Sequence, residues 1–341
     1  MSLMAKLKKN SKIKLTAQMD KSEFFQEQEV IPTDVPMMNV ALTGSLDGGI
    51  TAGLTVLAGP SKHFKTSFAL KMAAAYLNAK PDAVMLFYDS EFGSPQSYFD
   101  NFGIDTSRVL HVPIMDVEEL KFDIIAQLED MDKEDDVIIV IDSIGNLASK
   151  KELEDAKDGK SVADMSRAKA LKGLFRMTTP YLAMKNIPLL AVNHTYKEIG
   201  LYPKDIVGGG TGIYYSANNI WIIGRRQNKT GTEVMGYDFV IKVEKSRFVK
   251  EQSKIPITVS WEGGIDEMSG LLDVAMASGH VIKPSNGWYQ KVNEEKKYRL
   301  ADLDKNFWSS ILEDQVFQEF VKNAFSVGSA TIDLDIEVEG D

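Results

Sequence analysis

A phosphate-binding turn is the clearest chemical signal in this sequence. Residues 59–66 read Gly-Pro-Ser-Lys-His-Phe-Lys-Thr, which follows the phosphate-loop pattern except that Phe64 stands where the second glycine belongs. Such a turn points backbone N–H groups at a phosphate from a helix N-terminus. Lys65 would neutralise the β- and γ-phosphates, and the Thr66 hydroxyl would ligate Mg²⁺. The alternative is a strand–turn–helix junction that uses Gly59-Pro60 for its turn alone.

Carboxylates follow two apolar strands of the same predicted sheet. Val137–Ile141 is apolar at every position and leads into Asp142. A buried acid is costly unless a cation accompanies it, so we predict that Asp142 lies on the Mg²⁺ side of a nucleotide. Val84–Tyr88 leads to Asp89, Ser90 and Glu91. We predict that Glu91 orients and deprotonates the water that attacks the γ-phosphate.

Two more side chains are candidates for contact with the nucleotide, each with a simpler alternative. Tyr98 could stack on the base, or be an ordinary half-buried tyrosine. His194 follows the strand Pro188–Val192. Because ligands gather at the carboxyl ends of parallel strands, it could sense the γ-phosphate. The alternative is a polar residue that only caps the strand. The predicted nucleotide-binding set is Gly59, Pro60, Ser61, Lys62, His63, Phe64, Lys65, Thr66, Ser67, Tyr98 and Asp142, with Thr66 and Asp142 on the metal.

Alternating apolar strands and helical segments must position these groups. Helical spacing over 66–80 and 118–131 separates strands that are apolar on both faces, the pattern of a parallel sheet covered on both sides. We therefore predict an α/β nucleotide-binding fold with a mostly parallel central sheet flanked by helices. The predicted segments are a basic arm over 1–30, a core over 31–264, a small C-terminal α/β unit over 265–328 and an acidic tail over 329–341.

Two long loops leave the same edge of this sheet. Ser149–Ala163 is charged and weakly periodic, and Thr195–Gly212 ends in a run with four glycines, 208–212. Loops of this length inside a compact domain are usually functional or disordered. Backbone amides and cations on one face would suit a phosphodiester backbone; simple solvent exposure is the alternative. The predicted DNA-binding residues are Arg167, Lys169, Lys197, Gly208, Gly209 and Gly210.

The stretch Gly224–Lys254 is locally basic, with eight basic against four acidic side chains in a chain of net charge −10. Lys245 and Arg247 alternate near a strand end and so point the same way. They could reach a neighbouring subunit's nucleotide as arginine fingers do, or form a solvated face.

Composition excludes several classes of protein. The chain has 341 residues, 44% of them hydrophobic, and no cysteine, which excludes disulfides, thiolate metal sites and cysteine nucleophiles. The basic N-terminus lacks the apolar block of a secretory signal, and we expect a soluble protein of a reducing compartment with no membrane contact. The net negative charge argues against indiscriminate DNA coating.

Several blocks together resemble the UvsX-type recombinases of tailed phages, within the RecA family. They are GPSKHFKT (59–66), LFYDSEFG (86–93), IDSIGNLASKKE (141–152), AVNHTY (191–196), GGGTG (208–212), VEKSR (243–247), GGID…SGLLD (263–273) and KPSNGWY (283–289). The resemblance extends from about Phe24 to Phe325. Phe64, unusual under the general phosphate-loop pattern, is what this subfamily shows.

The resemblance implies a RecA-like fold and a DNA-dependent ATPase that uses ATP and Mg²⁺. It implies a helical homo-oligomer on single-stranded DNA that pairs the strand with a homologous duplex, assisted by a loader and single-strand-binding proteins, in the host cytoplasm. It assigns catalysis to Glu91, Lys65 and His194, with Lys245 and Arg247 acting on the next subunit's ATP. His194 stands where RecA itself has a glutamine. A hexameric helicase-type motor and a non-hydrolysing regulator with the same fold remain alternatives.

Overall fold

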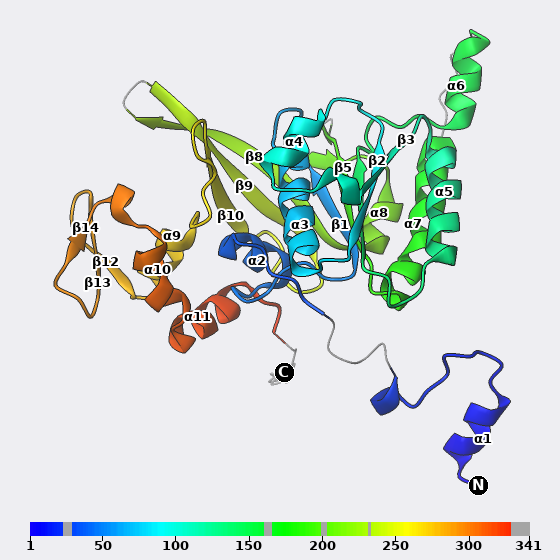
Figure 1. Ribbon diagram of the computed structural model, residues 1–341, viewed down its shortest axis with the longest axis horizontal. Helices are drawn as coiled ribbons and strands as arrows, with labels where there is room; N and C mark the ends of the chain where they lie inside the picture. Colours follow the sequence, from blue (N-terminus) through cyan, green and yellow to red (C-terminus); the bar gives the residue numbers. More distant parts are fainter. Residues whose placement is uncertain (23–28, 160–165, 199–202, 231–232, 329–341) are drawn as a thin grey trace, which may run out of the picture. The chain divides into compact units, whose positions relative to one another are not determined.

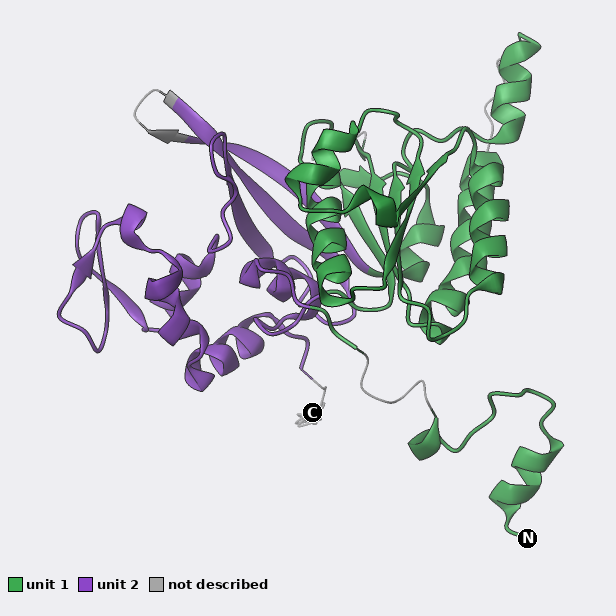
Figure 2. Ribbon diagram, in the orientation of Figure 1, with its two compact units in different colours: residues 1–31, 50–218 green, residues 32–49, 219–341 purple. Residues whose placement is uncertain are grey.

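The computed structural model describes residues 1–22, 29–159, 166–198, 203–230 and 233–328 (Figure 1). The chain forms two compact units: residues 1–31 with 50–218, and residues 32–49 with 219–341 (Figure 2). The second unit thus gathers an early segment and the last third of the chain, a division that differs from the segments expected from the sequence. Residues 23–28 of the predicted basic arm lie outside the described residues, as does the acidic tail.

Five parallel strands form the sheet of the first unit. Their order is β1 (Gly53–Ala58), β5 (Pro188–Asn193), β4 (Val137–Asp142), β2 (Val84–Asp89) and β3 (Val109–Pro113). The first three are buried at every position, which explains why their sequences are mostly apolar. The α/β prediction with a mostly parallel sheet is confirmed.

Register brings the chemical groups to one edge of this sheet. Asp89 pairs with Asp142 across β2 and β4, and Ala58 pairs with Asn193 across β1 and β5. Because all four strands run the same way, the turn after β1, Glu91 after β2 and His194 after β5 emerge together.

The helices that follow the strands of the first unit are α3 (Lys65–Ala79), α4 (Gln96–Asn101), α5 (Val117–Asp130), α6 (Lys150–Lys157), α7 (Ser166–Met184) and α8 (Thr211–Ser216). Two of them, α5 and α6, start at side-chain caps. The Asp116 carboxylate accepts the Glu119 backbone N–H and so caps α5. Helix α7 continues through Pro180.

The two predicted loops contain more regular structure than we expected. Helix α6 occupies much of 149–163, because Ser149 and Glu152 form a reciprocal capping box at its start. Within 195–212, β6 (Thr195–Lys197) pairs antiparallel with β7 (Asp205–Val207). The description of these segments as plain loops is therefore wrong for the described parts.

The second unit has its own antiparallel strands, β8 (Ala217–Thr230), β9 (Glu233–Ser246), β10 (Lys254–Ser260) and β11 (Gly264–Ile265). Buried Trp221 donates its indole N–H to the Ala41 carbonyl at 3.1 Å and so ties β8 to α2 (Pro36–Thr43). The remaining elements are α9 (Leu271–Ala277), β12 (Val281–Ser285), β13 (Trp288–Lys291), β14 (Lys297–Tyr298), α10 (Lys305–Leu312) and α11 (Gln315–Phe325).

Two separate helices end the described part of the second unit. Asp304 caps α10 and Asp314 caps α11, so the chain turns between them. At the other end of the chain, α1 (Leu3–Asn10) has no buried residue. No helix among the residues described is long and apolar enough to cross a membrane.

Candidate nucleotide-binding site

The turn between β1 and α3 contains two residues with a left-handed backbone. Lys62 and Phe64 both adopt positive φ, at 62° and 61°, and Phe64 is the N-cap of α3 with ψ 18°. This left-handed conformation favours glycine, so phenylalanine at this position raises the conformational energy by about 1 kcal/mol. The Phe64 ring packs edge-on against Phe68, with centroids 5.6 Å apart. The aromatic contact offsets part of the cost and keeps the turn curled.

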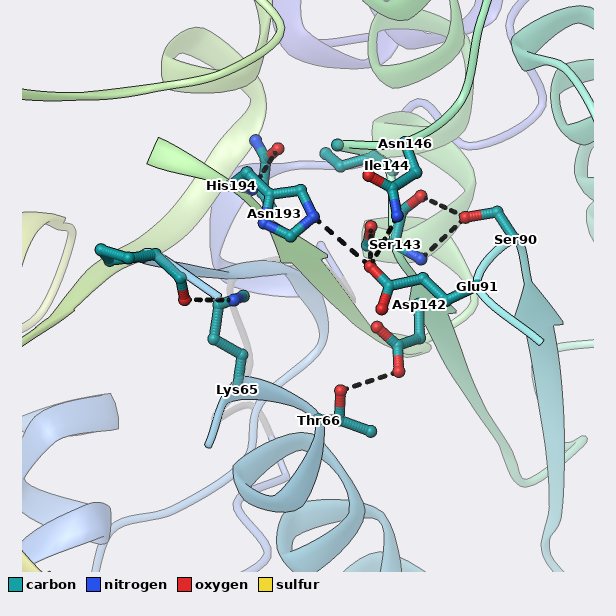
Figure 3. Close-up of polar contacts among 12 residues, drawn as sticks. Lys65, Thr66, Ser90, Glu91, Asp142, Ser143, Ile144, Asn146, Asn193 and His194 are labelled. Atoms are coloured by element: carbon teal, nitrogen blue, oxygen red, sulfur yellow. Dashed lines mark hydrogen bonds and ion pairs between the residues drawn. The ribbon is translucent and has the colours of Figure 1, made fainter. Parts of the chain in front are cut away.

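Lys65 is held inside this turn. Its side chain is buried and donates through Nζ to the Pro60 carbonyl at 2.8 Å. Burial lowers the pKa of Lys65, while the charges of Glu91 and Asp142 raise it. The amine thus lies against a backbone carbonyl of the loop that would surround a phosphate (Figure 3).

Asp142 has one oxygen engaged and one without a partner. Oδ2 accepts the Thr66 hydroxyl at 2.8 Å, whereas Oδ1 is buried without a hydrogen bond. Burial, above all, raises the pKa of Asp142 to about 6; the Thr66 hydrogen bond works against this rise. A buried oxygen without a donor beside a threonine hydroxyl fits the oxygen ligands and ordered waters that Mg²⁺ prefers.

Three side chains converge on a single oxygen of Glu91. Oε1 accepts from Ser143 Oγ at 2.7 Å and from Asn146 Nδ2 at 3.0 Å, and His194 Nε2 lies 3.4 Å away (Figure 3). The pKa of Glu91 is lowered, first by His194, then by Ser143 and by the charge of Lys65, against an opposing effect of burial. The carboxylate is therefore kept ionised and held by one oxygen.

Neighbouring groups fix the donors of Glu91. Ser90 Oγ donates to the Ser143 carbonyl at 2.7 Å and accepts its N–H at 3.0 Å. The carboxylate of Asp89 accepts the backbone N–H groups of Glu91 and Phe92 at 2.9 and 2.8 Å. The strand end and the loop after it therefore form one hydrogen-bonded assembly.

His194 is positioned by glycine and asparagine. A Cβ added at Gly145 would lie 2.3 Å from the His194 ring, so the loop after β4 can pass there only without a side chain. Asn193 Oδ1 accepts the His194 N–H at 2.8 Å, and Asn193 Nδ2 donates to the Gly208 carbonyl at 2.7 Å. The predicted sensor is thereby connected to the start of the glycine-rich segment.

Sequence reasoning missed Ser143 and Asn146 as partners of Glu91. Asn146 lies 55 residues from Glu91 in the chain, and a lone asparagine in a loop carries no pattern. Ser143 directly follows Asp142 at the end of β4, and this position in the sequence could have identified it as part of the site. Tyr98, expected to stack on a base, is hydrogen-bonded through its hydroxyl to Ser67 in α3, and burial raises the pKa of the phenol.

The predicted DNA-binding residues fall into different environments. Arg167 donates to the carbonyls of Leu147, Ile144 and Gly145 at 2.6–3.0 Å, and this geometry favours a role in holding the loop after β4 over a DNA contact. Lys197 pairs with Asp205 across the β6–β7 ribbon at 2.8 Å. Lys169 is exposed, and Gly209 and Gly210 have positive φ before α8.

Lys245 and Arg247 belong to the second unit. Lys245 pairs with Ile220 in the β8–β9 register, at the end of β9. Its pKa is lowered by burial and by the neighbouring Arg247 charge, and Arg247 is exposed. The two cations thus lie close together at one strand end.

Comparison with known proteins places the chain in a family. The model of the RecA N-terminal domain matches residues 3–266, and that of the C-terminal domain of the bacteriophage T4 recombination and repair protein matches residues 268–321. The recombination and repair protein of Enterobacteria phage T4 is 47% identical, over 99% of this chain and 90% of its own. This chain belongs to the RecA family.

More distant relatives agree with this assignment. Protein RecA of Syntrophus aciditrophicus is 27% identical over 84% of this chain and 81% of its own length. Protein RecA of Thermus aquaticus is 27% identical over 76% and 75%. Proteins of this family use ATP with Mg²⁺, and the donor set around Lys65, Thr66 and Asp142 is of the kind that such a ligand requires.

Proposed function

We propose that this protein is an ATP-dependent recombinase that polymerises on single-stranded DNA and pairs it with a homologous duplex. The observation that carries the proposal is the joint geometry of a phosphate loop, a half-partnered Asp142 and an ionised Glu91 held by one oxygen. A protein that only bound the nucleotide would not need Glu91. Similarity over 99% of the chain to a recombination and repair protein favours strand pairing over a helicase motor.

The residues of the first unit can carry out hydrolysis in defined roles. An ATP γ-phosphate would take the Lys65 amine from the Pro60 carbonyl, because a phosphate oxygen is the stronger acceptor. Thr66 and Asp142 would hold Mg²⁺, which supplies charge neutralisation on the phosphate oxygens. Glu91 uses the oxygen not held by Ser143 and Asn146 to orient and deprotonate the attacking water.

Binding would be reported to the DNA-binding segments through His194. The His194 side chain lies beside Glu91. The backbone carbonyl of His194 accepts the Gly208 N–H at 3.0 Å. A shift of His194 toward the γ-phosphate would therefore pull on the glycine-rich segment after β7. The segments 149–163 and 195–212 are the proposed DNA-binding loops, whose order would depend on the nucleotide.

Neighbouring subunits would complete the site. Lys245 and Arg247 are proposed to reach the ATP of the next protomer, where two cations stabilise the charge of the transferred phosphoryl group. The arm over 1–30 is proposed to contact the adjacent protomer, and loader and single-strand-binding proteins are proposed partners. A division of the chain near residue 265 is supported by the two family models, which meet between residues 266 and 268.

ATPase rates with and without single-stranded DNA, with electron micrographs of the same samples, test the proposal. The wild type should be stimulated by DNA and should form filaments with ATP. Lys65→Ala should form none and should lose DNA-stimulated hydrolysis, because the phosphates lose their principal cation. Normal hydrolysis by Lys65→Ala would contradict the site, and closed rings in place of filaments would favour the helicase alternative.

A further inference from the structure

His111, in β3, lies next to the strand end that leads to Glu91. Strands β2 and β3 are neighbours in the sheet (Figure 1), and His111 stands opposite Phe87 in their parallel register. The two rings are stacked, with centroids 5.9 Å apart. Phe87 and Asp89 are two residues apart on β2 and therefore share one face of the sheet. From its place beside Phe87, the His111 imidazole reaches Asp89, with Nε2 3.2 Å from Oδ2.

Asp89 is buried, and both oxygens of its carboxylate have partners. Oδ1 accepts the backbone N–H groups of Glu91 and Phe92, and Oδ2 contacts the imidazole of His111. Because a carboxylate oxygen accepts, Nε2 of His111 carries the proton of this hydrogen bond. A buried oxygen that loses its donor costs about 1–3 kcal/mol. His111 therefore completes the bonding of the group that holds the turn at Glu91.

The turn after Glu91 depends on such support, because its backbone is strained. Phe92 has a φ of 54°, in the left-handed region that costs residues other than glycine about 1–2 kcal/mol. Its side chain is 59% exposed, so the packing of the ring contributes little to holding this conformation. The bond from the Phe92 N–H to Asp89 is the contact that opposes relaxation of the turn. A relaxed turn would displace Glu91, its neighbour in the chain.

Packing alone does not require an imidazole at position 111. The His111 side chain is 53% exposed, at a cavity of about 340 Å³ whose lining includes Phe87, Phe99 and Val109. A phenylalanine at this position would stack on Phe87 equally well and would add no polar atom to an apolar lining. What the histidine adds is a nitrogen that donates to Asp89.

Glu91 is thus held from two sides. Its carboxylate accepts from Ser143 and Asn146, and these contacts decide which oxygen is left for a water molecule. Its backbone N–H donates to Asp89 at 2.9 Å, and this contact sets where the whole residue stands relative to the phosphate loop. A displacement of about 1 Å in a catalytic group can slow a reaction on the order of a hundred-fold. The backbone contact therefore matters for the rate as much as the side-chain contacts do.

We propose that His111 is a positioning residue for ATP hydrolysis, which acts through Asp89 to keep the turn at Glu91 and Phe92 in place. It does not touch the reacting atoms in this role. Its effect is on the rate of the chemical step, and binding of ATP at the phosphate loop is left to other residues. This inference rests on the proposed function, because it assumes that Glu91 activates the attacking water.

Steady-state ATPase kinetics of two substitutions at position 111 test the inference. His111→Phe keeps a ring over Phe87 and removes the donor, whereas His111→Gln removes the ring and supplies an amide N–H in place of Nε2. With single-stranded DNA and Mg²⁺, His111→Phe should lower kcat about ten-fold and leave the KM for ATP within about two-fold of wild type. His111→Gln should recover most of the lost kcat. Affinity for a fluorescent ATP analogue, measured without DNA, should be the same in all three proteins.

The outcomes separate this inference from the proposed function. If DNA stimulates the wild type and His111→Phe matches it in kcat, His111 does not position Glu91, while the proposed function stands. If His111→Gln is as slow as His111→Phe, the hydrogen bond to Asp89 is not the cause and the inference is overturned. Weaker binding of the ATP analogue, in proportion to the loss of kcat, would show a general structural defect and would overturn it as well. If the wild type itself shows no hydrolysis that DNA stimulates, the proposed function fails, and this inference fails with it.

Discussion

At the residue scale, side chains proposed to bind ATP and Mg²⁺ are hydrogen-bonded to other groups of the protein. Lys65 bonds the Pro60 carbonyl, and Thr66 bonds one oxygen of Asp142. The second oxygen of Asp142 remains buried without a partner. Such an oxygen costs about 1–3 kcal/mol in a protein without ligand. In a metal-binding site this cost has a purpose, because the carboxylate oxygen is already in place to ligate the cation.

Asp142 should therefore limit the stability of the protein without nucleotide. Its folded-state pKa of about 6 lies above its ordinary value of 3.8, so the ionised carboxylate destabilises the folded protein. This destabilisation is complete above pH 6 and declines as the pH falls toward 3.8. Asp142→Asn removes this effect. It should raise the free energy of unfolding at pH 8 by on the order of 3 kcal/mol, with a smaller gain at pH 5, while abolishing Mg²⁺-dependent hydrolysis.

Urea unfolding at pH 8 and pH 5, without nucleotide or Mg²⁺, measures the effect. Asp82→Asn, at an exposed position, makes the same change of charge and should leave stability nearly unchanged. A loss of stability in Asp142→Asn at pH 8 would show that the ionised carboxylate is stabilised by contacts that outweigh its burial.

The sequence predicted the chemistry of the site better than its internal contacts. Lys65, Thr66, Glu91 and Asp142 follow strand ends, and parallel strands bring such positions together whatever the details of packing. Asn146 could not be predicted, because its contact with Glu91 depends on how the loop after β4 turns back. Arg167 looked available for DNA because its charge is visible in the sequence, whereas the three carbonyls that it holds are not.

At the element scale, the sequence contained signals that the loop predictions did not use. Ser149 and Glu152 have the spacing of a capping box, and they begin α6 inside the segment expected to be a loop. Asp304 and Asp314 likewise precede α10 and α11. Caps of this kind override weak hydrophobic periodicity, because they satisfy backbone N–H groups that would otherwise lack partners.

The N-terminus of α3 offers a test of why phenylalanine is tolerated at position 64. Alanine there keeps the left-handed backbone and loses the edge-on contact with Phe68, whereas glycine loses the contact and relieves the strain. Phe64→Gly should therefore unfold at a higher free energy than Phe64→Ala, by about 1 kcal/mol. This order is the reverse of the one expected inside a helix, where alanine is favoured.

Equilibrium unfolding in urea of the two variants and the wild type decides the matter. Ala74→Gly, at an ordinary helical position in α3, is the comparison. It should lower the free energy of unfolding, because alanine is favoured inside a helix. Equal stability of the two Phe64 variants would mean that the turn relaxes out of the left-handed region once the ring is removed.

At the scale of the whole molecule, the proposed assembly divides each active site between protomers. Glu91 and Lys65 lie in the first unit, and Lys245 and Arg247 lie in the second. Lys245 is half-buried at a strand end. Its pKa is lowered by burial and by the charge of Arg247, so an anionic partner would favour the charged form of this pair. This arrangement makes hydrolysis a property of the polymer.

Mixing two inactive variants should therefore restore activity. Glu91→Ala lacks the base but keeps intact cations, and Lys245→Ala with Arg247→Ala has the converse defect. In a random equal mixture on DNA, about one interface in four joins an intact Glu91 to a neighbour's intact cations, so about a quarter of the wild-type rate should return. Each variant alone should hydrolyse ATP at least about a hundred-fold more slowly than wild type.

The mixing experiment distinguishes sharing between protomers from action within one chain. A chain that carries all three substitutions, mixed with Lys65→Ala, is the control. Every active site in that mixture lacks either Glu91 or Lys65 and should stay inactive. If the first mixture also stays inactive while both variants coassemble on DNA, Lys245 and Arg247 act within their own protomer or not at all. Rescue near one quarter, appearing only when DNA is present, would show that the filament brings the two halves of the site together.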